Sequence, residues 1–329
     1  MLFNMTQDIP KLTITELLGQ DQYVIPLYQR NYSWRRKEIF QLLQDILENG
    51  EAKDDRTGTG TISVFGRNIR FDLREGFPAV TTKKLAWKAC VGELLWFIEG
   101  SGDERRLAEI THGSKEGTVT IWTPNALAPY WKTKSKYKGD LGRVYGVQWR
   151  HWQSTNTEWI SEKGISYKKN IEIDQLTNLI NGIKQDPNGR RHILNAWNAG
   201  ELDDMALPPC HILCQFYVNK NQELSCHMYQ RSVDVFLGLP FNIASYALFT
   251  HMIAQVSNLS VGELIISTGD THIYKNHIDQ VKEQLTRDPL PLPQLVLNSS
   301  IKDIDKFTMG DITLVNYSSH SPLKAPMAV

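Results

Sequence analysis

Residues 207–242 bring a thiol, cationic and hydroxylated side chains and an amide into one short stretch of the chain. The stretch reads LPPCHILCQFYVNKNQELSCHMYQRSVDVFLGLPFN. Its chemically capable residues are, in order, Cys210, His211, Arg231, Ser232, Asp234 and Asn242. A thiol can act as a nucleophile, an arginine can bind a phosphate and an amide can read a base. Their proximity in sequence predicts a single active site.

Cys210 is the candidate nucleophile. A cysteine between apolar residues is usually a small buried hydrophobe. Cys214 and Cys226 fit that interpretation, because they lie on apolar stretches without a charged neighbour. Cys210 differs because it follows two prolines and precedes a histidine. A thiol becomes reactive where cationic or hydrogen-donating groups favour the thiolate, and we expect Arg231 and Ser232 to supply them if the chain doubles back.

The pattern of residues 215–228 predicts that the chain does double back. Apolar and polar side chains alternate over residues 215–217 and again over residues 224–228, on either side of the turn-forming residues 219–221. Two alternating runs around such a turn indicate a β-hairpin. A hairpin would return Arg231 to the neighbourhood of Cys210.

Four segments of the chain resemble thymidylate synthases, namely PPCH, QRSVDVFLGLPFN, GDTHIY and the terminal KAPMAV. The resemblance extends from about Glu38 to Val329. It implies an α+β fold with a single large domain, in which helices cover a large mixed, mainly antiparallel sheet. It also implies a methyltransferase that converts dUMP to dTMP, uses 5,10-methylenetetrahydrofolate as cosubstrate, requires no metal and releases dihydrofolate.

The resemblance assigns catalytic roles along the chain. The Cys210 thiolate would attack C6 of the uracil ring, and Glu93 would relay protons through water. Tyr145 would belong to the proton-removal network, and Asn242 would read the base. Asp234 and His211 complete the set of catalytic residues that the resemblance implies. For Glu93 the alternative is an exposed carboxylate; in an apolar environment its pKa would rise. Tyr145 follows Arg143, which stands where proline is common in the family.

The substrate-binding residues implied by the resemblance are mostly arginines. The phosphate would be held by Arg56, by Arg231 with Ser232, and by Arg190 and Arg191 of a partner subunit, so a homodimer is implied. The uracil would contact Asn242, and the 3′-hydroxyl of the deoxyribose would contact His272 and Tyr274. Without the resemblance, Arg56 would be interpreted as a surface arginine, and His272 and Tyr274 as polar residues at the end of a strand.

The folate site implied by the resemblance comes from three parts of the chain: the segment 121–125, against which the folate ring stacks, the turn over residues 234–241, and the C-terminus. Its residues are Ile121, Trp122, Asn125, Asp234, Leu237, Gly238, Phe241 and Ala328. The competing interpretation of an aromatic residue is the core, which we expect for Trp87 and Trp96. An apolar terminus such as LKAPMAV is often frayed, whereas in the family it folds over the bound folate as a lid.

Asn242 indicates which pyrimidine is bound. An amide donates to O4 of uracil and accepts from N3–H, whereas cytosine presents the opposite pattern and suits an aspartate better. Asn242 therefore favours dUMP. The nearest alternative is a dUMP hydroxymethylase, in which water takes the place of the hydride. An alternative of another class is an inactive regulatory or nucleic-acid-binding protein.

Periodicity predicts the elements that position these residues. We expect a helix from Glu38 that stops at Asn49-Gly50, a strand pair turning at Gly66, and an amphipathic helix over residues 89–100. Further helices are expected over residues 173–183 and 243–259. The polar residues 153–170 look like a loop, and the lysine-rich residues 126–138 look like a surface insertion. Arg190 and Arg191 follow a turn and are expected at a strand edge.

Composition narrows the class of protein. The 329 residues carry 36 basic and 36 acidic side chains, so electrostatics does not favour nucleic acid or an anionic membrane as partner. No apolar run approaches the ~20 residues of a membrane helix, and the N-terminus does not resemble a signal peptide. Four cysteines without paired spacing indicate reduced thiols and a cytoplasmic location. Metal-ligand spacing is not found among the histidines and cysteines.

Residues 1–37 form an extension that does not match the synthase pattern. The segment IPLYQRNYSW resembles the opening of a ParB-like nuclease family, but that resemblance ends after about 35 residues. We expect an appended segment that packs on the domain of residues 38–329 or contacts a partner. Its arginines and interleaved aromatic residues also resemble a nucleic-acid-binding patch.

Overall fold

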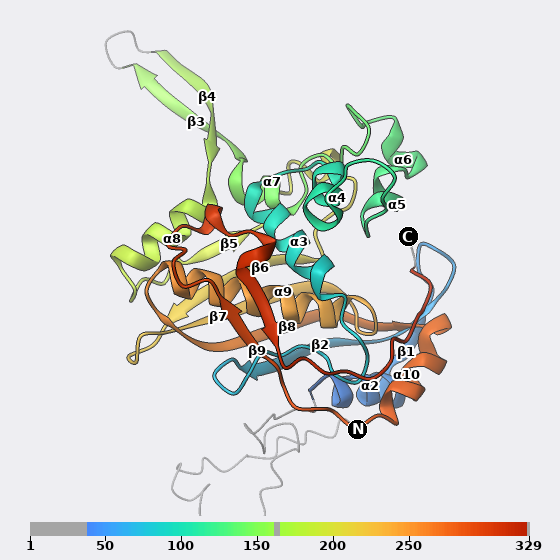
Figure 1. The fold of residues 1–329 in the computed structure, drawn as a ribbon. Helices are drawn as coiled ribbons and strands as arrows, with labels where there is room; N and C mark the ends of the chain where they lie inside the picture. Colours follow the sequence, from blue (N-terminus) through green and yellow to red (C-terminus); the bar gives the residue numbers. More distant parts are fainter. Residues whose placement is uncertain (1–37, 161–164, 328–329) are drawn as a thin grey trace, which may run out of the picture. The chain divides into compact units, whose positions relative to one another are not determined.

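A computed structural model describes residues 38–160 and 165–327, so the predicted extension 1–37 and Ala328 lie outside the described residues (Figure 1). The helices are α2 (Glu38–Asn49), α3 (Trp87–Glu99), α4 (Glu104–His112), α5 (Thr123–Ala126), α6 (Pro129–Lys132), α7 (Tyr145–Arg150), α8 (Gln175–Gln185), α9 (Gly238–Val256) and α10 (Ile278–Leu285). The strands are β1 (Glu51–Lys53), β2 (Thr61–Asp72), β3 (Trp152–Ile160), β4 (Ile165–Ile173), β5 (Ile193–Asn195), β6 (His211–Val218), β7 (Glu223–Asp234), β8 (Ser260–Tyr274), β9 (Gln294–Leu297) and β10 (Ile312–Val315). Short 3₁₀ turns are η2 (Leu202–Asp204), η3 (Lys275–His277), η4 (Ile304–Lys306) and η5 (Met309–Asp311).

A six-stranded sheet organises this part of the chain, with the strand order β1-β2-β8-β7-β6-β5. Neighbouring strands are antiparallel, except that β7 and β8 run parallel. Because β7 and β8 are parallel, they end at the same edge of the sheet, where Asp234 lies opposite His272. The predicted α+β fold with a mixed, mainly antiparallel sheet is confirmed.

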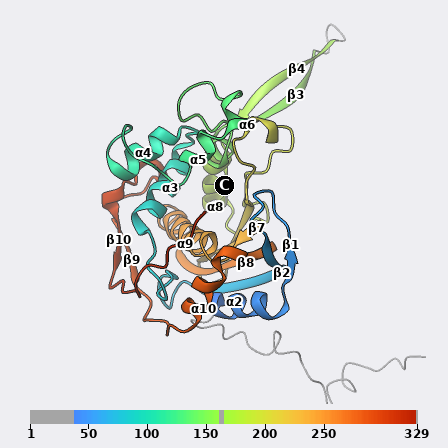
Figure 2. The ribbon, with the colours of Figure 1, turned by 90° about the vertical axis from the view of Figure 1, so that its right-hand side faces the viewer.

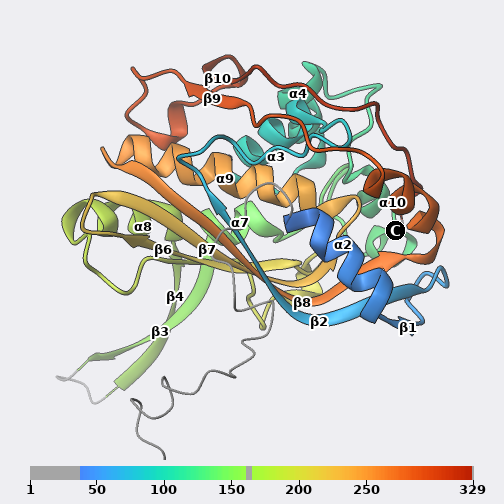
Figure 3. The same cartoon turned by 90° about the horizontal axis from the view of Figure 1, so that it is seen from below.

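Helices bury one face of the sheet. In Figure 3, α9 lies between the sheet and α3. The predicted buried helix is confirmed in α9, which is apolar on all sides and is buried along most of its length. The helix predicted from Glu38 is α2, which ends at Asn49 and lies beside α10 (Figure 2). The helix predicted over residues 173–183 is α8. The side chain of Asp174 caps its N-terminus by accepting the backbone N–H of Thr177.

The predicted hairpin is formed by β6 and β7, with Phe216 opposite Cys226. The side chain of Asn219 holds the turn, since its Oδ1 accepts the backbone N–H groups of Asn221 and Glu223 at 2.9 and 3.0 Å. Cys226 and Cys214 are buried, as predicted. The hairpin thus brings the start of β6 and the end of β7 to one place.

The expectation of a loop over residues 153–170 is wrong. These residues form most of the antiparallel hairpin β3–β4, with Gln153 opposite Glu172. The hairpin projects away from the six-stranded sheet (Figures 1 and 2). Strand β3 is largely polar, and in β4 the alternation of Ile165, Tyr167, Ile171 and Ile173 is interrupted by the polar residues 168–170, so the strand signal was weak.

Three further expectations require correction. Residues 61–72 form one continuous strand, because the pairing with β8 keeps its register across Gly66 (φ +70°), with Phe65 opposite Asp270 and Arg67 opposite Thr268. Helix α3 is not amphipathic, since every residue from Cys90 to Ile98 is buried. The segment 126–138 is not wholly a surface insertion, because the indole of Trp131 is buried and its Nε1 donates to the carbonyl oxygen of Asp140 at 2.6 Å.

Of the two tryptophans expected in the core, Trp96 is fully buried, whereas Trp87 is partly buried and packs against the core.

Candidate active site

Cys210 directly precedes β6 and faces the end of β7. The backbone N–H of Arg231 donates to the carbonyl oxygen of Cys210 at 2.8 Å. The guanidinium of Arg231 donates to the carbonyl oxygens of Pro209 and Pro208 at 2.8 and 3.0 Å. The hairpin thus returns Arg231 to the neighbourhood of Cys210, as expected from the sequence. Arg231 also holds the Pro-Pro-Cys turn in place. Burial raises the pKa of the Cys210 thiol, while Arg231, Tyr145 and Arg56 oppose that rise.

Tyr145 joins the thiol-bearing turn to the interior. It is the first residue of α7, and its hydroxyl accepts the backbone N–H of Cys210 at 2.7 Å. Its ring stacks on the imidazole of His211 at 4.2 Å between centroids, and the Nδ1 of His211 lies 2.8 Å from the hydroxyl of Tyr246. Burial lowers the pKa of His211 to about 3, so this histidine is neutral at physiological pH. Arg143 pairs with Glu201 at 2.7 Å and thereby holds the turn before α7.

Glu93 is a buried carboxyl group next to this cluster. It lies within α3, with 8 % of its surface exposed. The Nε1 of Trp122 donates to its Oε1 at 2.7 Å, and the Trp122 ring meets the Tyr145 ring edge-on at 5.8 Å. Burial raises the pKa of Glu93 to about 7, against the opposing effect of the Trp122 hydrogen bond. A group with this pKa can both release and accept a proton near neutral pH.

The orientation of the Asn242 amide is determined by its neighbours. The buried Gln230 donates through Nε2 to the carbonyl oxygen of Ser232 at 3.1 Å. A carbonyl oxygen can only accept, so Gln230 must present its Oε1 to Asn242, whose Nδ2 donates to it at 3.0 Å. The Asn242 amide therefore keeps one N–H and its Oδ1 for another partner.

The parallel ends of β7 and β8 carry a second group of predicted residues. Asp234 lies opposite His272 in the register, and its Oδ1 accepts the backbone N–H groups of Phe236 and Leu237, each at 3.0 Å. His272 is held by Asp270 through Nδ1 at 2.8 Å, and its ring meets that of Tyr274 at 5.1 Å. His272 and Tyr274 thus occupy the same end of β8, two residues apart.

The predicted phosphate-binding arginines differ in exposure. Arg231 is partly buried and its guanidinium lies 5.3 Å from the Trp197 ring centroid, whereas Arg56, Arg190 and Arg191 are exposed. Arg56 lies in the loop between β1 and β2, whose last residue, Gly60, accepts the backbone N–H of Lys275 at 3.0 Å, and the charge of Arg56 acts on the Cys210 thiol. Arg190 and Arg191 precede β5 and do not lie within a strand. In a single subunit the structure brings Arg56 and Arg231 towards Cys210 and does not do so for this pair.

The predicted folate residues come from two regions. Trp122 and Asn125 are buried at the start of α5, whereas Ile121 is 48 % exposed. Leu237, Gly238 and Phe241 form the start of α9 directly after Asp234. Beside these apolar side chains lies the carboxylate of Asp234, whose side chain is 22 % exposed.

Sequence reasoning missed three residues next to the predicted site. Besides Gln230, these are Lys83 and His277, both buried. The Nζ of Lys83 donates to the carbonyl oxygen of Phe236 and lies 3.6 Å from the centroid of its ring. Burial lowers the pKa of Lys83 to about 8, and Asp234 opposes the shift. The signal for Lys83 was weak, because a lysine in the sequence TTKK is usually solvated; His277 follows the GDTHIY segment by only three residues.

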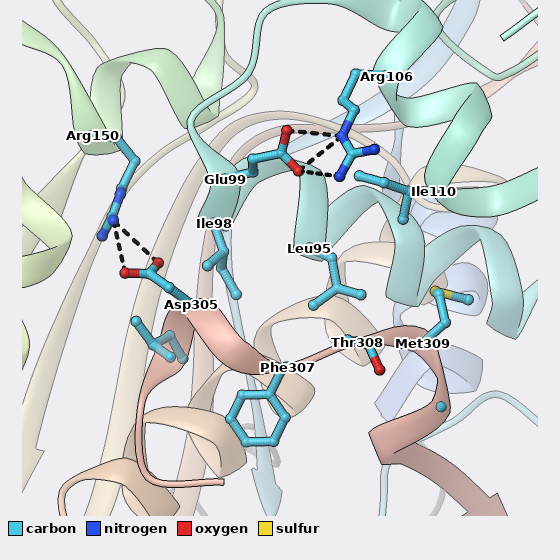
Figure 4. A pocket seen from close by; sticks show the side chains of 12 residues that line it. Leu95, Ile98, Glu99, Arg106, Ile110, Arg150, Asp305, Phe307, Thr308 and Met309 are labelled. Carbon is cyan, nitrogen blue, oxygen red and sulfur yellow. Dashed lines mark hydrogen bonds and ion pairs between the residues drawn. The ribbon is translucent and has the colours of Figure 1, made fainter. Parts of the chain in front are cut away.

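A hollow of about 640 Å³ lies elsewhere, between α3, α4 and the η4–η5 segment (Figure 4). Its two arginines are already paired, Arg106 with Glu99 at 2.9 Å and Arg150 with Asp305 at 3.1 Å. Among the described residues that line this hollow, none is a predicted site residue. It is therefore separate from the candidate active site.

The described residues contain neither a metal-binding cluster nor a membrane-spanning helix. Within residues 38–160 and 165–327, no cluster of histidine, cysteine, aspartate or glutamate has the geometry to hold a metal ion. In the same part of the chain, none of the helices combines the length and the apolar character needed to cross a membrane.

The start of β6 and the parallel ends of β7 and β8 bring Cys210, Arg231 and Asp234 to one edge of a mixed sheet in an α+β fold, and helix α3 adds the buried Glu93 beside Trp122. The family profile described as thymidylate synthase matches residues 37–329, which is most of the chain. The chain belongs to the thymidylate synthase family.

Proposed function

We propose that this protein is a thymidylate synthase, which converts dUMP to dTMP with 5,10-methylenetetrahydrofolate and releases dihydrofolate. The observation that carries the proposal is the chain of contacts from Cys210 through Tyr145 and Trp122 to Glu93. It links a nucleophile to a buried carboxyl group that can move a proton near neutral pH.

Cys210 begins the reaction. Its sulfur forms a bond with C6 of the uracil ring, which moves electron density to C5 and makes that carbon nucleophilic. Because burial raises the pKa of the thiol, the resting enzyme holds it protonated, and the proton must leave as the bond forms. The cationic Arg231 favours the thiolate during that step. The reduced folate supplies the one-carbon unit and the hydride when it is bound.

Glu93 and Tyr145 then handle protons. C5 must lose its proton after it has gained the one-carbon unit, and the bond between C6 and the Cys210 sulfur breaks when the hydride reaches the exocyclic methylene, which gives dTMP, dihydrofolate and the free enzyme. The Tyr145 hydroxyl accepts the backbone N–H of Cys210 and also hydrogen-bonds to the Cys210 thiol, so it lies beside the reacting sulfur, and we assign it to orient a water next to the ring. The carboxyl group of Glu93, with a pKa of about 7, is suited to exchange protons with that water.

Asn242 supports uracil as the base. Its remaining N–H and its Oδ1 offer one donor and one acceptor side by side, which match O4 and N3–H of uracil. Gln230 prevents the amide from turning over to match cytosine. The deoxyribose hydroxyl is assigned to His272 and Tyr274, and the phosphate to Arg56, Arg231 and Ser232 with the partner subunit's Arg190 and Arg191. This last assignment makes the proposed enzyme a homodimer.

Mass spectrometry of the product tests the proposal, with dihydrofolate absorbance followed in the same tube. We expect dUMP to gain a methyl group with an equal amount of dihydrofolate. A hydroxymethylated nucleotide with tetrahydrofolate would instead assign the dUMP hydroxymethylase reaction, in which water replaces the hydride. An unchanged nucleotide mass would overturn both and favour a regulatory protein.

A further inference from the structure

His277 connects the C-terminal segment to the Asp234 turn. It is the last residue of η3 and is fully buried. Its Nε2 lies 2.7 Å from the carbonyl oxygen of Pro326. Since a carbonyl oxygen only accepts, Nε2 carries the proton and donates it. Within the described part of the chain, this is the hydrogen bond closest to the C-terminus.

The other side of the imidazole faces Asp234. Its Nδ1 lies 4.0 Å from the Asp234 Oδ1 and has no hydrogen-bond partner among the described residues. The ring packs between Phe236 and Tyr274, each 5.4 Å away between centroids. Burial of a polar ring with one unsatisfied nitrogen is unfavourable, so a phenylalanine would pack there at lower cost. The contact with Pro326 accounts for a histidine at this position.

The part of the C-terminal segment that precedes Pro326 is held by hydrogen bonds at residues 317–321. The Tyr317 hydroxyl donates to the carbonyl oxygen of Val80 at 2.7 Å, the His320 N–H donates to that of Thr81 at 2.9 Å, and Arg287 donates to that of Ser321 at 2.7 Å. Beyond residue 321, Leu323 and Ala325 pack against the core and the Gln280 side-chain amide lies 3.4 Å from the carbonyl oxygen of Lys324. The contact of His277 with Pro326 is shorter and lies nearer to the C-terminus, so His277 is placed to position the last described residues.

We infer that His277 is a positioning residue that docks the C-terminal segment beside Asp234 and so contributes to folate binding and not to dUMP binding. This inference rests on the proposed function, in which Asp234 meets the pterin. Docking through the imidazole joins two parts of the folate site, the Asp234 turn and the C-terminal segment, through one side chain.

Two amide substitutions separate the hydrogen bond from the shape of the ring. In His277→Gln the amide nitrogen takes the position of Nε2 and can still donate to Pro326. In His277→Asn the amide is too short and reaches only the position of Nδ1. We expect His277→Asn to raise the KM for methylenetetrahydrofolate about five- to tenfold, the value of one lost hydrogen bond, with the Kd for dUMP unchanged. His277→Gln should stay within about twofold of the parent enzyme.

Hydrogen exchange measured by mass spectrometry supplies a readout that does not depend on activity. Amide exchange in the peptide of residues 318–329 should be faster in His277→Asn than in the parent and unchanged in His277→Gln. Truncation after Leu323 removes Pro326 together with Ala328 of the proposed folate site, so its effect is measured by folate binding and not by turnover. In that truncated background, His277→Asn should cause no further rise in the Kd for methylenetetrahydrofolate.

Each outcome decides the inference. Parent-like exchange and KM in His277→Asn would overturn it, and so would an equal loss in both variants, because that result would assign the effect to ring packing. If His277→Asn does not bind dUMP, the inference is decided by comparing His277→Gln and the truncated protein with the parent. If the parent itself does not methylate dUMP, the proposed function fails while the exchange experiment still tests the docking contact.

Discussion

Cys210 illustrates how a side chain acquires a role from its surroundings. Two other cysteines of the same region are buried among apolar groups, whereas Cys210 is contacted by Tyr145 and lies beside Arg231. We predict that Cys210→Ser abolishes turnover while dUMP still binds, because the hydroxyl is a far weaker nucleophile than the thiolate. Product formation and equilibrium binding of dUMP measure the two effects. Methylation above a few per cent of the parent rate would remove Cys210 from the proposed role.

Asn242→Asp tests base recognition. A carboxylate lacks the N–H that matches O4 of uracil, and its protonated form suits cytosine. We expect the ratio of kcat/KM for dUMP over dCMP to fall by about tenfold or more, the equivalent of one lost hydrogen bond with an unpaired partner. Gln230→Glu is the control for an added carboxylate, because its oxygen can still accept from the Asn242 Nδ2 and the preference for dUMP should remain. A variant that prefers dUMP as strongly as the parent would exclude Asn242 as the reader.

Glu93 makes a prediction about stability and pH. Burial raises its pKa to about 7 from the ordinary value of 4.5. The folded state therefore binds the proton more tightly than the unfolded state, and the contribution of Glu93 to the free energy of unfolding falls as pH rises from 4.5 to 7. Glu93→Gln does not titrate, so its free energy of unfolding relative to the parent should rise by about 2 to 3 kcal/mol between pH 5 and pH 8.

Urea unfolding of both proteins at each pH checks this prediction. The pKa values of His211 and His251 are lowered by burial to about 3 and about 4, so these residues stabilise the fold as pH rises towards 6.5. Because they are present in both proteins, their effect cancels in the difference. A difference that does not change with pH would show that Glu93 keeps an ordinary pKa.

At the scale of elements, the loop between β1 and β2 carries Arg56 and is organised by Asp55. The Asp55 carboxylate accepts the backbone N–H groups of Thr57 and Gly60 at 3.0 and 2.6 Å, and these hydrogen bonds and that of the Thr57 hydroxyl lower its pKa to about 2. We predict that Asp55→Ala raises the KM for dUMP about three- to tenfold, because Arg56 loses a defined position. Asp54→Ala, one residue earlier, is the control and should resemble the parent. Equal KM values for the two variants would contradict the prediction.

At the scale of the whole molecule, the proposed site needs two chains. Arg190 and Arg191 are exposed in the single subunit and precede β5. We predict that the double variant Arg190→Ala/Arg191→Ala and the variant Cys210→Ser are each nearly inactive. Unfolded together and refolded, they should recover about a quarter of the parent activity, since half of the dimers are hybrids with one intact site. Lack of recovery, with hybrids verified by native mass spectrometry, would exclude a shared site.

Sequence and structure agree best where a pattern is dictated by burial. The apolar stretch that became α9 and the alternation that became β6 and β7 were predicted correctly, because burial imposes a period on the side chains. The β3–β4 hairpin was missed because β3 is largely polar and the polar residues 168–170 interrupt the alternation in β4. Helix α3 was predicted to be amphipathic, yet Glu93 is buried with its apolar neighbours, because Trp122 supplies the hydrogen bond that makes burial tolerable.

The sequence by itself determined the chemistry available to this protein: a cysteine after two prolines, an arginine returned to it by a hairpin, and an amide suited to uracil. Only the tertiary structure decided how these groups are tuned and oriented. The pKa of Glu93, the direction of the Asn242 amide through Gln230, and the contact of His277 with Pro326 all join residues that lie far apart in the chain. Such contacts depend on burial and on the direction of each donor, which the spacing of residues along the chain does not encode.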